Sequence, residues 1–158
     1  MNELLSALKT VVETALGDTY TYYIGKVAIP SQSNLPLVTF YPISMNQSHS
    51  GTVKDRVEYE IAIEVFLNMK QYFDNENGEG QENETVEALV NIVEDRETDG
   101  DAKANTLVNL INSNINLTDT VLYTDNINVE YEPYYDTGEF PVAKVLVTFS
   151  AHHLVNRT

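Results

Sequence analysis

Residues 57–67 alternate between apolar and other side chains, and this pattern constrains the fold more than any other stretch of the chain. The odd positions hold Val57, Tyr59, Ile61, Ile63, Val65 and Leu67, and three of the five even positions hold Glu58, Glu60 and Glu64. A period of two predicts a β-strand with one core face and one face that meets water or a partner. The strand exceeds the usual length of about five or six residues. We therefore expect it to run the height of a sheet and to fix the register of its neighbours.

The length and composition indicate one soluble domain. A chain of 158 residues is long enough to bury a core without disulfides, so one domain over residues 1–158 is the simplest organisation. The chain has no cysteine, which excludes disulfides and thiolate metal sites and favours a reducing cytosol. The first residues lack a signal-peptide pattern, and no apolar run approaches the roughly eighteen residues of a membrane span. We therefore expect neither export nor a membrane partner.

The charge is strongly unbalanced, because 24 acidic residues stand against 9 basic ones, for a formal net charge of −15. Phosphate contacts need clustered Lys and Arg, so this balance argues against sequence-specific nucleic-acid binding and against anionic membranes. Two interpretations remain. The acidic residues form an ordinary solvated surface, or they form a surface that lies close to DNA without retaining it.

The first part of the chain predicts a helix followed by strands. Apolar residues recur every three or four positions in residues 2–16, and Gly17 follows, as is typical of an amphipathic helix with a glycine C-cap. Residues 19–24 and 37–41 are rich in aromatic and β-branched side chains and predict strands. Pro42 then indicates an edge position, a bulge or the end of a strand.

Residues 44–52 are small and polar and show no helical period. We expect them to form the tip of an extended hairpin whose far arm is the long strand. Lys54 and Arg56 lie at the base of that arm. They are either solvated or paired with acidic residues of a neighbouring subunit.

The second half of the chain predicts two helices and a closing hairpin. Residues 83–93 and 101–115 carry apolar side chains at helical spacing. Residues 127–132 and 144–151 alternate with a period of two and predict a hairpin whose second arm pairs with the long strand. The resulting order predicts an α+β fold, in which an antiparallel β-sheet with strands of mixed length has helices packed on one face.

The acidic segment 95–101 begins like a calcium-binding EF-hand loop, with oxygen ligands at alternate positions and glycine at the sixth. Its twelfth position is Thr106, where the calcium loop needs a bidentate Glu. We therefore interpret the segment as a solvated loop in which Asp99 or Asp101 caps the following helix. The acidic run 74–82 is a weaker candidate still, so we expect no metal or cofactor.

Recognisable catalytic motifs are missing from the sequence. It has no cysteine nucleophile, nucleophile elbow, phosphate-binding glycine loop with Lys, or HExxH helix. His49 has serine neighbours, but adjacency in sequence does not give triad geometry. His152 and His153 are consecutive on an expected strand, so they point to opposite faces and are poorly placed to chelate one ion together. We do not expect an enzyme.

Ten tyrosines and no tryptophan supply amphipathic side chains for contacts. Tyr131, Tyr134 and Tyr135 gather near the last hairpin, either as interface anchors or as core and edge packing. A sheet face without helices, long strands and an extended hairpin suit a subunit whose partners are copies of itself.

The order of elements resembles that of the tail terminator, or tail completion, proteins of long-tailed bacteriophages. The likeness is carried by residues 4–16, 29–42 with its Leu35-Pro36-Leu37-Val38 step, 57–67 and 142–151. Beside these stretches, the acidic segments 74–82 and 94–101 look like variable insertions. The family has no catalytic residues to transfer.

The resemblance implies a structural virion protein of the tail or neck, assembled in the host cytoplasm. Such proteins form a ring, commonly of six copies, that docks on the finished tail tube, stops its polymerisation and offers a surface for head–tail joining. The implied partners are further copies of the chain, the tail tube protein and the head–tail connector protein, while DNA passes through the ring. For such a ring we expect contacts through Asn46, His49, Lys54, Arg56, Tyr134 and Tyr135, and a channel lined by Glu58, Glu60 and Glu64.

Three alternatives stay open. The first is a head-closure or neck connector subunit from the same virion context. The second is an acidic DNA-mimic inhibitor, which would be monomeric or dimeric and would bind a basic enzyme. The third is a small hydrolase. A measurement of mass in solution separates a ring from a mimic.

Overall fold

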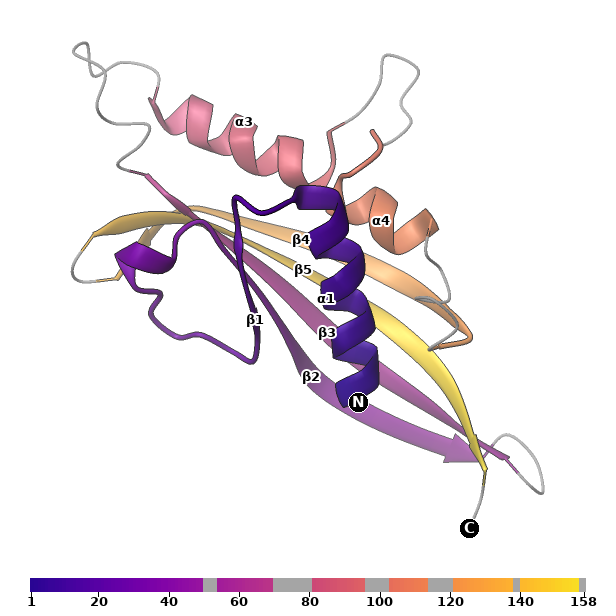
Figure 1. Cartoon of the computed structure of the whole chain (residues 1–158). Helices are drawn as coiled ribbons and strands as arrows, with labels where there is room; N and C mark the ends of the chain where they lie inside the picture. Colours follow the sequence, from indigo (N-terminus) through magenta and orange to yellow (C-terminus); the bar gives the residue numbers. More distant parts are fainter. Residues whose placement is uncertain (50–53, 70–80, 96–102, 114–120, 138–139, 157–158) are drawn as a thin grey trace.

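The computed structural model describes residues 1–49, 54–69, 81–95, 103–113, 121–137 and 140–156 (Figure 1). In chain order the elements are α1 (Asn2–Leu16), β1 (Thr21–Ile24), the 3-10 helix η1 (Gln32–Asn34), β2 (Leu37–His49), β3 (Lys54–Asn68), α3 (Gln81–Val93), α4 (Leu107–Ser113), β4 (Tyr123–Asp136) and β5 (Pro141–Asn156). The expected α+β class is confirmed.

One five-stranded sheet organises the fold, with strand order β1-β2-β3-β5-β4. The long strand β3 lies at its centre and pairs antiparallel with both β2 and β5. Strand β4 is antiparallel to β5 at one edge. At the other edge β1 runs parallel to β2, so the expectation of a wholly antiparallel sheet is wrong there. The reason is the connecting segment 25–36, which leads the chain back to begin β2 in the same direction as β1.

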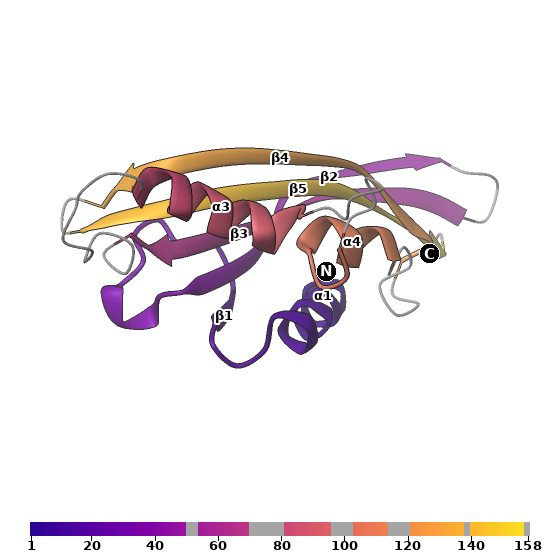
Figure 2. The ribbon, with the colours of Figure 1, turned by 90° about the horizontal axis from the view of Figure 1, so that it is seen from above.

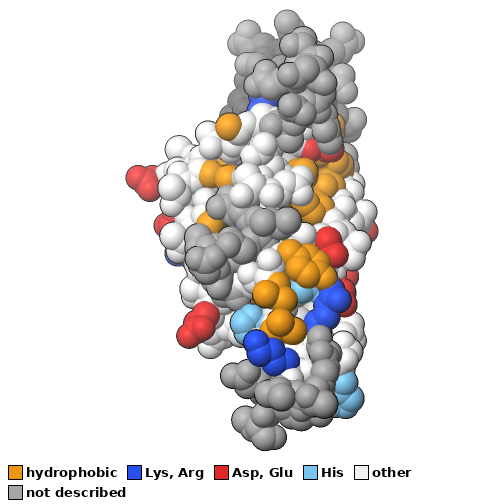
Figure 3. All heavy atoms as spheres, turned by 90° about the vertical axis from the view of Figure 1, so that its right-hand side faces the viewer, with side chains coloured by type: hydrophobic (Ala, Val, Ile, Leu, Met, Phe, Trp, Pro, Cys, Tyr) orange, Lys and Arg blue, Asp and Glu red, His pale blue; other side chains and the backbone are white. Residues whose placement is uncertain are grey.

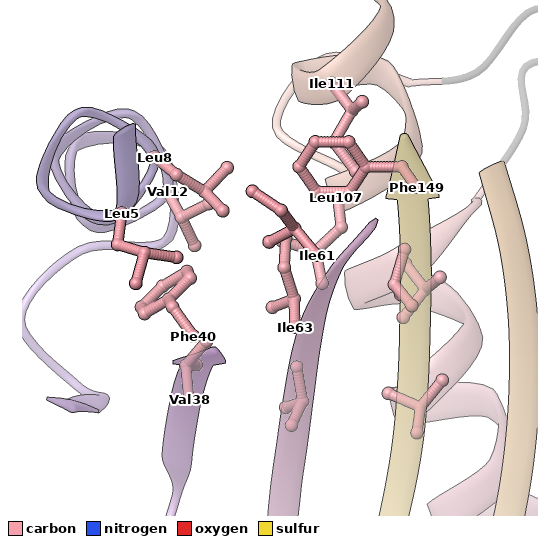
Figure 4. Packing of buried hydrophobic residues seen from close by; sticks show 14 of the residues in the cluster. Leu5, Leu8, Val12, Val38, Phe40, Ile61, Ile63, Leu107, Ile111 and Phe149 are labelled. Carbon is pink, nitrogen blue, oxygen red and sulfur yellow. The ribbon is translucent and has the colours of Figure 1, made fainter. Parts of the chain in front are cut away.

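The helices cover one face of the sheet. Figure 2 shows α1, α3 and α4 on the same side of the curved strands. On this helix face the odd-numbered residues of β3 are buried as expected, except that Tyr59 is only partly buried. Figure 4 shows Leu5, Leu8 and Val12 of α1 packing toward Phe40 and Ile61, while Leu107 and Ile111 of α4 lie beside Phe149. The core therefore forms where the helical stripes meet the apolar face of the strands.

The opposite face is defined by the even-numbered residues of β3 and the residues that pair with them on β2 and β5, and we call it the helix-free face. It is not open along its whole length. Phe66 packs with Leu37 and Val142 in a second small cluster, against which Val27 and Leu35 also pack. The segment 25–36 therefore covers one end of this face, whereas the sequence pattern predicted a face free along its length.

The element boundaries show which local signals were sufficient. Gly17 has φ 79° and its N–H donates to Glu13 O at 3.0 Å, so the glycine C-cap of α1 is confirmed. Pro42 lies at a bulge in the β2–β3 ladder, which confirms one of its three expected roles. Helix α4 begins only at Leu107, and the hydroxyl of Thr106 accepts the Asn109 N–H at 3.4 Å.

The N-cap of α4 is thus Thr106, and the expectation of a helix over 101–115 capped by Asp99 or Asp101 is wrong at its start. Asn105, which precedes the cap, has φ 69°, a conformation that Asn tolerates and that interrupts helical geometry. Residues 96–102, which include most of the predicted EF-like loop, lie outside the described residues, as do residues 74–80 of the acidic run 74–82. Among the helices that are described, none is long and apolar enough to span a membrane.

Candidate interaction surface

The β2–β3 hairpin positions four of the predicted contact residues. Residues 44–49 were expected in a loop, but they continue β2 and pair with β3, from Ser44 opposite Glu60 to His49 opposite Asp55. They are strand despite their polar composition because β3 supplies a paired partner along their whole length. Side chains alternate across the ladder. Asn46, Lys54 and Arg56 therefore lie on the helix-free face, and His49 lies on the other.

His49 forms a contact within its own chain. Its Nδ1 lies 2.9 Å from Oδ1 of Asp55, and Nε2 of Gln47 donates to the other carboxylate oxygen at 2.8 Å. Asp55 is buried, with 5 % of its surface exposed. A buried carboxylate needs such donors, so these bonds hold the two arms of the hairpin together.

Arg56 belongs to a network that links β3, β5 and β4. Its Nη2 lies 3.0 Å from Nδ1 of His152, and Nε2 of His152 lies 2.9 Å from Oδ1 of Asp125. A guanidinium group has only donors, so Nδ1 accepts and the proton of the neutral ring sits on Nε2, from which it donates to Asp125. Tyr123 stacks on His152 with ring centroids 4.3 Å apart. The Cζ atom of Arg56 lies 5.3 Å from the centre of the same tyrosine ring.

Sequence reasoning missed this network. Arg56 was expected to be solvated or paired with another subunit, and instead it is held by a buried histidine of its own chain, since His152 is 3 % exposed. The alternation of side chains along β5 was the signal in the sequence that bears on this network. It predicts that His152 and His153 lie on opposite faces, and the register confirms that arrangement. Figure 3 shows basic and histidine side chains gathered toward this end of the molecule.

The three glutamates predicted to line a channel all lie on the helix-free face, but their surroundings differ. Glu60 is exposed and accepts a hydrogen bond from Ser44 Oγ at 3.0 Å. Glu58 is half-buried and accepts one from Ser150 Oγ at 3.0 Å. Glu64 is only 5 % exposed, beneath the covering segment 25–36. In the single chain, Glu64 is thus withdrawn from the surface that it was expected to line.

Glu64 interacts instead with neighbours in the covered half of the face. It lines a cavity of about 290 Å³ with Lys26 and Lys144, and its Oε2 has no hydrogen-bond partner among the described residues. Burial, together with the adjacent Glu64 carboxylate that its hydroxyl bonds, raises the pKa of Tyr41. Lys26 lies 5.5 Å from the centre of the Tyr41 ring.

Strand β4 adds further carboxylates to the helix-free face. Glu130 and Glu132 are exposed and lie opposite Leu146 and Lys144. Lys144 Nζ pairs with Glu132 at 2.8 Å. The uncovered part of the face therefore has an excess of acid, since Arg56 already has His152 as its partner and Lys144, beside the covered end, pairs with Glu132.

The predicted tyrosine contacts do not join the hairpin residues. Tyr135 pairs with Val142 through the backbone, at the end of the sheet opposite to Lys54, which pairs with Asn156. The side chains of Tyr134 and Tyr135 lie outside the described part of the structure. Tyr131, the third member of that group, is half-buried, and its hydroxyl donates to Glu94. Burial, together with this hydrogen bond to a carboxylate, raises the pKa of Tyr131.

Within the described ranges, no group of three or more His, Asp or Glu side chains is arranged to hold a metal ion. In comparisons with known proteins, no family model matches the sequence and no curated protein matches it.

Proposed function

We propose that this chain is a structural virion protein of the tail-terminator type. In this proposal its copies form a ring that caps the tail tube of a long-tailed phage, stops the addition of tube subunits and presents a surface for head–tail joining. The observation that carries the proposal is the group of carboxylates on the uncovered part of the helix-free face, where Glu58, Glu60 and Glu130 lie on long strands with no helix above them.

An acidic wall of this kind suits a passage for DNA. Carboxylates repel phosphates and release no counterions from the duplex, so DNA slides past without being retained. Arg56 and Lys144 are occupied by His152 and Glu132 and do not offset that repulsion by reaching for the backbone. The order of helix, strands, helices and closing hairpin adds support through its resemblance to the family.

The DNA-mimic alternative is less well supported. A mimic needs a row of exposed carboxylates for a basic partner to bind. Of the three glutamates on β3, only Glu60 is exposed, while Glu58 is half-buried and Glu64 is buried.

The test combines assembly with tube capping. We expect the purified chain to sediment as a closed oligomer with a central hole in negative-stain electron microscopy. We also expect it to bind one end of purified tail tubes and to halt polymerisation of the tube protein from the same genome. A chain that stays monomeric and leaves tube growth unchanged contradicts the proposal. Binding to the connector without binding to the tube indicates a head-closure subunit instead.

A further inference from the structure

The edge of the sheet formed by β1 and β2 carries most of the large hydrophobic side chains that are exposed among the described residues. Among the described residues, seven large hydrophobic side chains are exposed, namely Met1, Tyr23, Ile24, Ile29, Ile43, Met45 and Leu122. All but Leu122 lie along this edge. Met45 is 56 % exposed and Ile43 is 48 % exposed. Exposed apolar side chains that gather in one place mark an interaction surface, whereas scattered ones do not.

The same part of the chain has no acidic residue. Residues 19–54, which contain β1 and β2, hold no Asp or Glu, although the chain has 24 acids in 158 residues and about five would be expected in such a stretch. Their two cations are Lys26 and Lys54. Copies with a charge of −15 repel one another, so edge strands without acidic residues are where they can approach.

The backbone of β2 is also available for pairing. Strand β1 pairs only with residues 37–40, so no described strand lies on the outer side of β2 beyond the bulge at Pro42. Residues 44–48 there carry no charge that would block an incoming strand. Met1, Pro42, Ile43, Met45 and Tyr59 line a groove of about 340 Å³ beside this edge.

We propose that the β1–β2 edge binds the β4 edge of a second copy of this chain, so that β2 of one copy and β4 of the next pair as neighbouring strands. This inference rests on the proposed ring and names the contact within it. Strand β4 is the opposite edge of the same sheet, and an extended strand adds to such an edge through its main-chain hydrogen bonds.

Charge favours this pairing over a pairing of two β4 edges. Strand β4 contains four acidic residues and no Lys or Arg, so pairing β4 with β4 sets like charges against each other. Pairing β4 with the β2 edge sets those acids against an uncharged strand flanked by Lys26 and Lys54. The contact is head-to-tail, and such a contact closes into a ring when the rotation between copies permits it.

The absence of cysteine from the sequence allows a direct test by cross-linking. Met45 and Asn128 are both exposed, on β2 and β4 respectively. With a bismaleimide reagent, we expect the double variant Met45→Cys/Asn128→Cys to give a ladder of cross-linked multimers. Each single variant should give no cross-linked species.

Each other outcome overturns a defined part of the proposal. Cross-linking of Met45→Cys to itself shows that two β2 edges meet, and it rejects the head-to-tail contact. No ladder from an oligomeric double variant shows that copies join elsewhere, which overturns the inference but leaves the proposed ring intact. A double variant and a parent chain that are both monomeric overturn the ring and the inference together.

A second variant tests the edge without cross-linking. Met45→Glu adds an acid to the acid-free edge, and burying an unpaired charge in a contact should weaken self-association roughly a hundredfold. The matched control is Ser6→Glu, which adds the same charge at an exposed position of α1 that faces away from the core. We expect the control to assemble like the parent chain, and both variants to keep the parent's melting temperature at concentrations where the copies are dissociated. Equal weakening by the two variants contradicts a specific edge.

Discussion

The two halves of the helix-free face, one near the hairpin and one beneath the segment 25–36, are both built on the even-numbered residues of β3. They are nevertheless different environments. Near the hairpin, Glu58 and Glu60 are bound by serine hydroxyls and remain in contact with solvent. Toward the other end, Glu64 and Phe66 are buried beneath the segment that connects β1 to β2. Alternation decides which face a residue occupies. A distant segment of the chain decides whether that face is covered.

The largest expected difference between the halves is in packing. Phe66 is 1 % exposed, so Phe66→Ala should lower the free energy of unfolding by about 3–5 kcal/mol through the cavity it leaves. Glu60→Ala, on the same face of the same strand, should change it by less than about 0.5 kcal/mol. Urea denaturation measures both. Similar losses for the two variants would show that the halves do not differ.

In the half near the hairpin, a smaller loss of unfolding free energy is expected when buried His152 loses its partner Arg56. Arg56→Ala removes the donor to Nδ1 of His152 and leaves a buried acceptor unsatisfied, which costs about 1–3 kcal/mol of unfolding free energy. Lys54→Ala, two residues away on the same face and exposed, serves as the control and should be nearly neutral. Chemical denaturation of both variants is the measurement. Equal stabilities would mean that the network contributes nothing.

The carboxylates of the two halves should act differently on tyrosine ionisation. The folded pKa of Tyr41 lies above the unfolded value near 10, so the contribution of this tyrosine to folding stability is fully present below pH 10 and is lost as the pH rises above it. Glu64→Gln removes a neighbouring charge, so it should lower the pKa of Tyr41 and lessen this alkaline loss. Titration of tyrosinate absorbance, with stability measured in parallel, provides the test.

The control for that titration is Glu60→Gln, which removes the same charge from the open half. It should leave the tyrosine titration of the parent chain unchanged. An unchanged titration in Glu64→Gln would show that burial alone raises the pKa of Tyr41.

The smallest expected effects concern the serines that bind the row of glutamates. Ser150 is 8 % exposed, so Ser150→Ala should cost about 1 kcal/mol of unfolding free energy through the loss of its bond to Glu58. Ser44 is exposed, and Ser44→Ala should cost less than about 0.5 kcal/mol because water replaces the bond to Glu60. Thermal denaturation of the two variants measures the difference. A larger cost for Ser44→Ala than for Ser150→Ala would contradict the conclusion that Ser150 is the more buried of the two serines.

Local periodicity was sufficient for the elements that bury one clear stripe. The predicted helix over residues 2–16 agrees with α1, and the central strand is centred on residues 57–67. It was insufficient for residues 44–49, whose polar composition is typical of a loop but which are strand because β3 lies beside them. Pairing with a partner strand is a tertiary effect, and composition does not report it.

The candidate site was predictable only in part. Asn46, Lys54 and Arg56 do share one face, as their spacing allows. The pairing of Arg56 with His152 joins residues 96 apart in sequence, and only the strand order β3-β5-β4 brings them together. The acid-free stretch 19–54, by contrast, is visible in the sequence itself, so charge distribution along the chain was a signal available before any fold was known.

The position of β3 between β2 and β5 also determines when the sheet can be completed during synthesis. Its second neighbour is the last strand of the chain, and Lys54 pairs with Asn156. Until residues 141–156 have left the ribosome, one whole edge of β3 has no partner. Such non-local pairing folds slowly and exposes a strand edge to other nascent chains. Truncation before β5 should therefore yield aggregates, not a smaller folded domain.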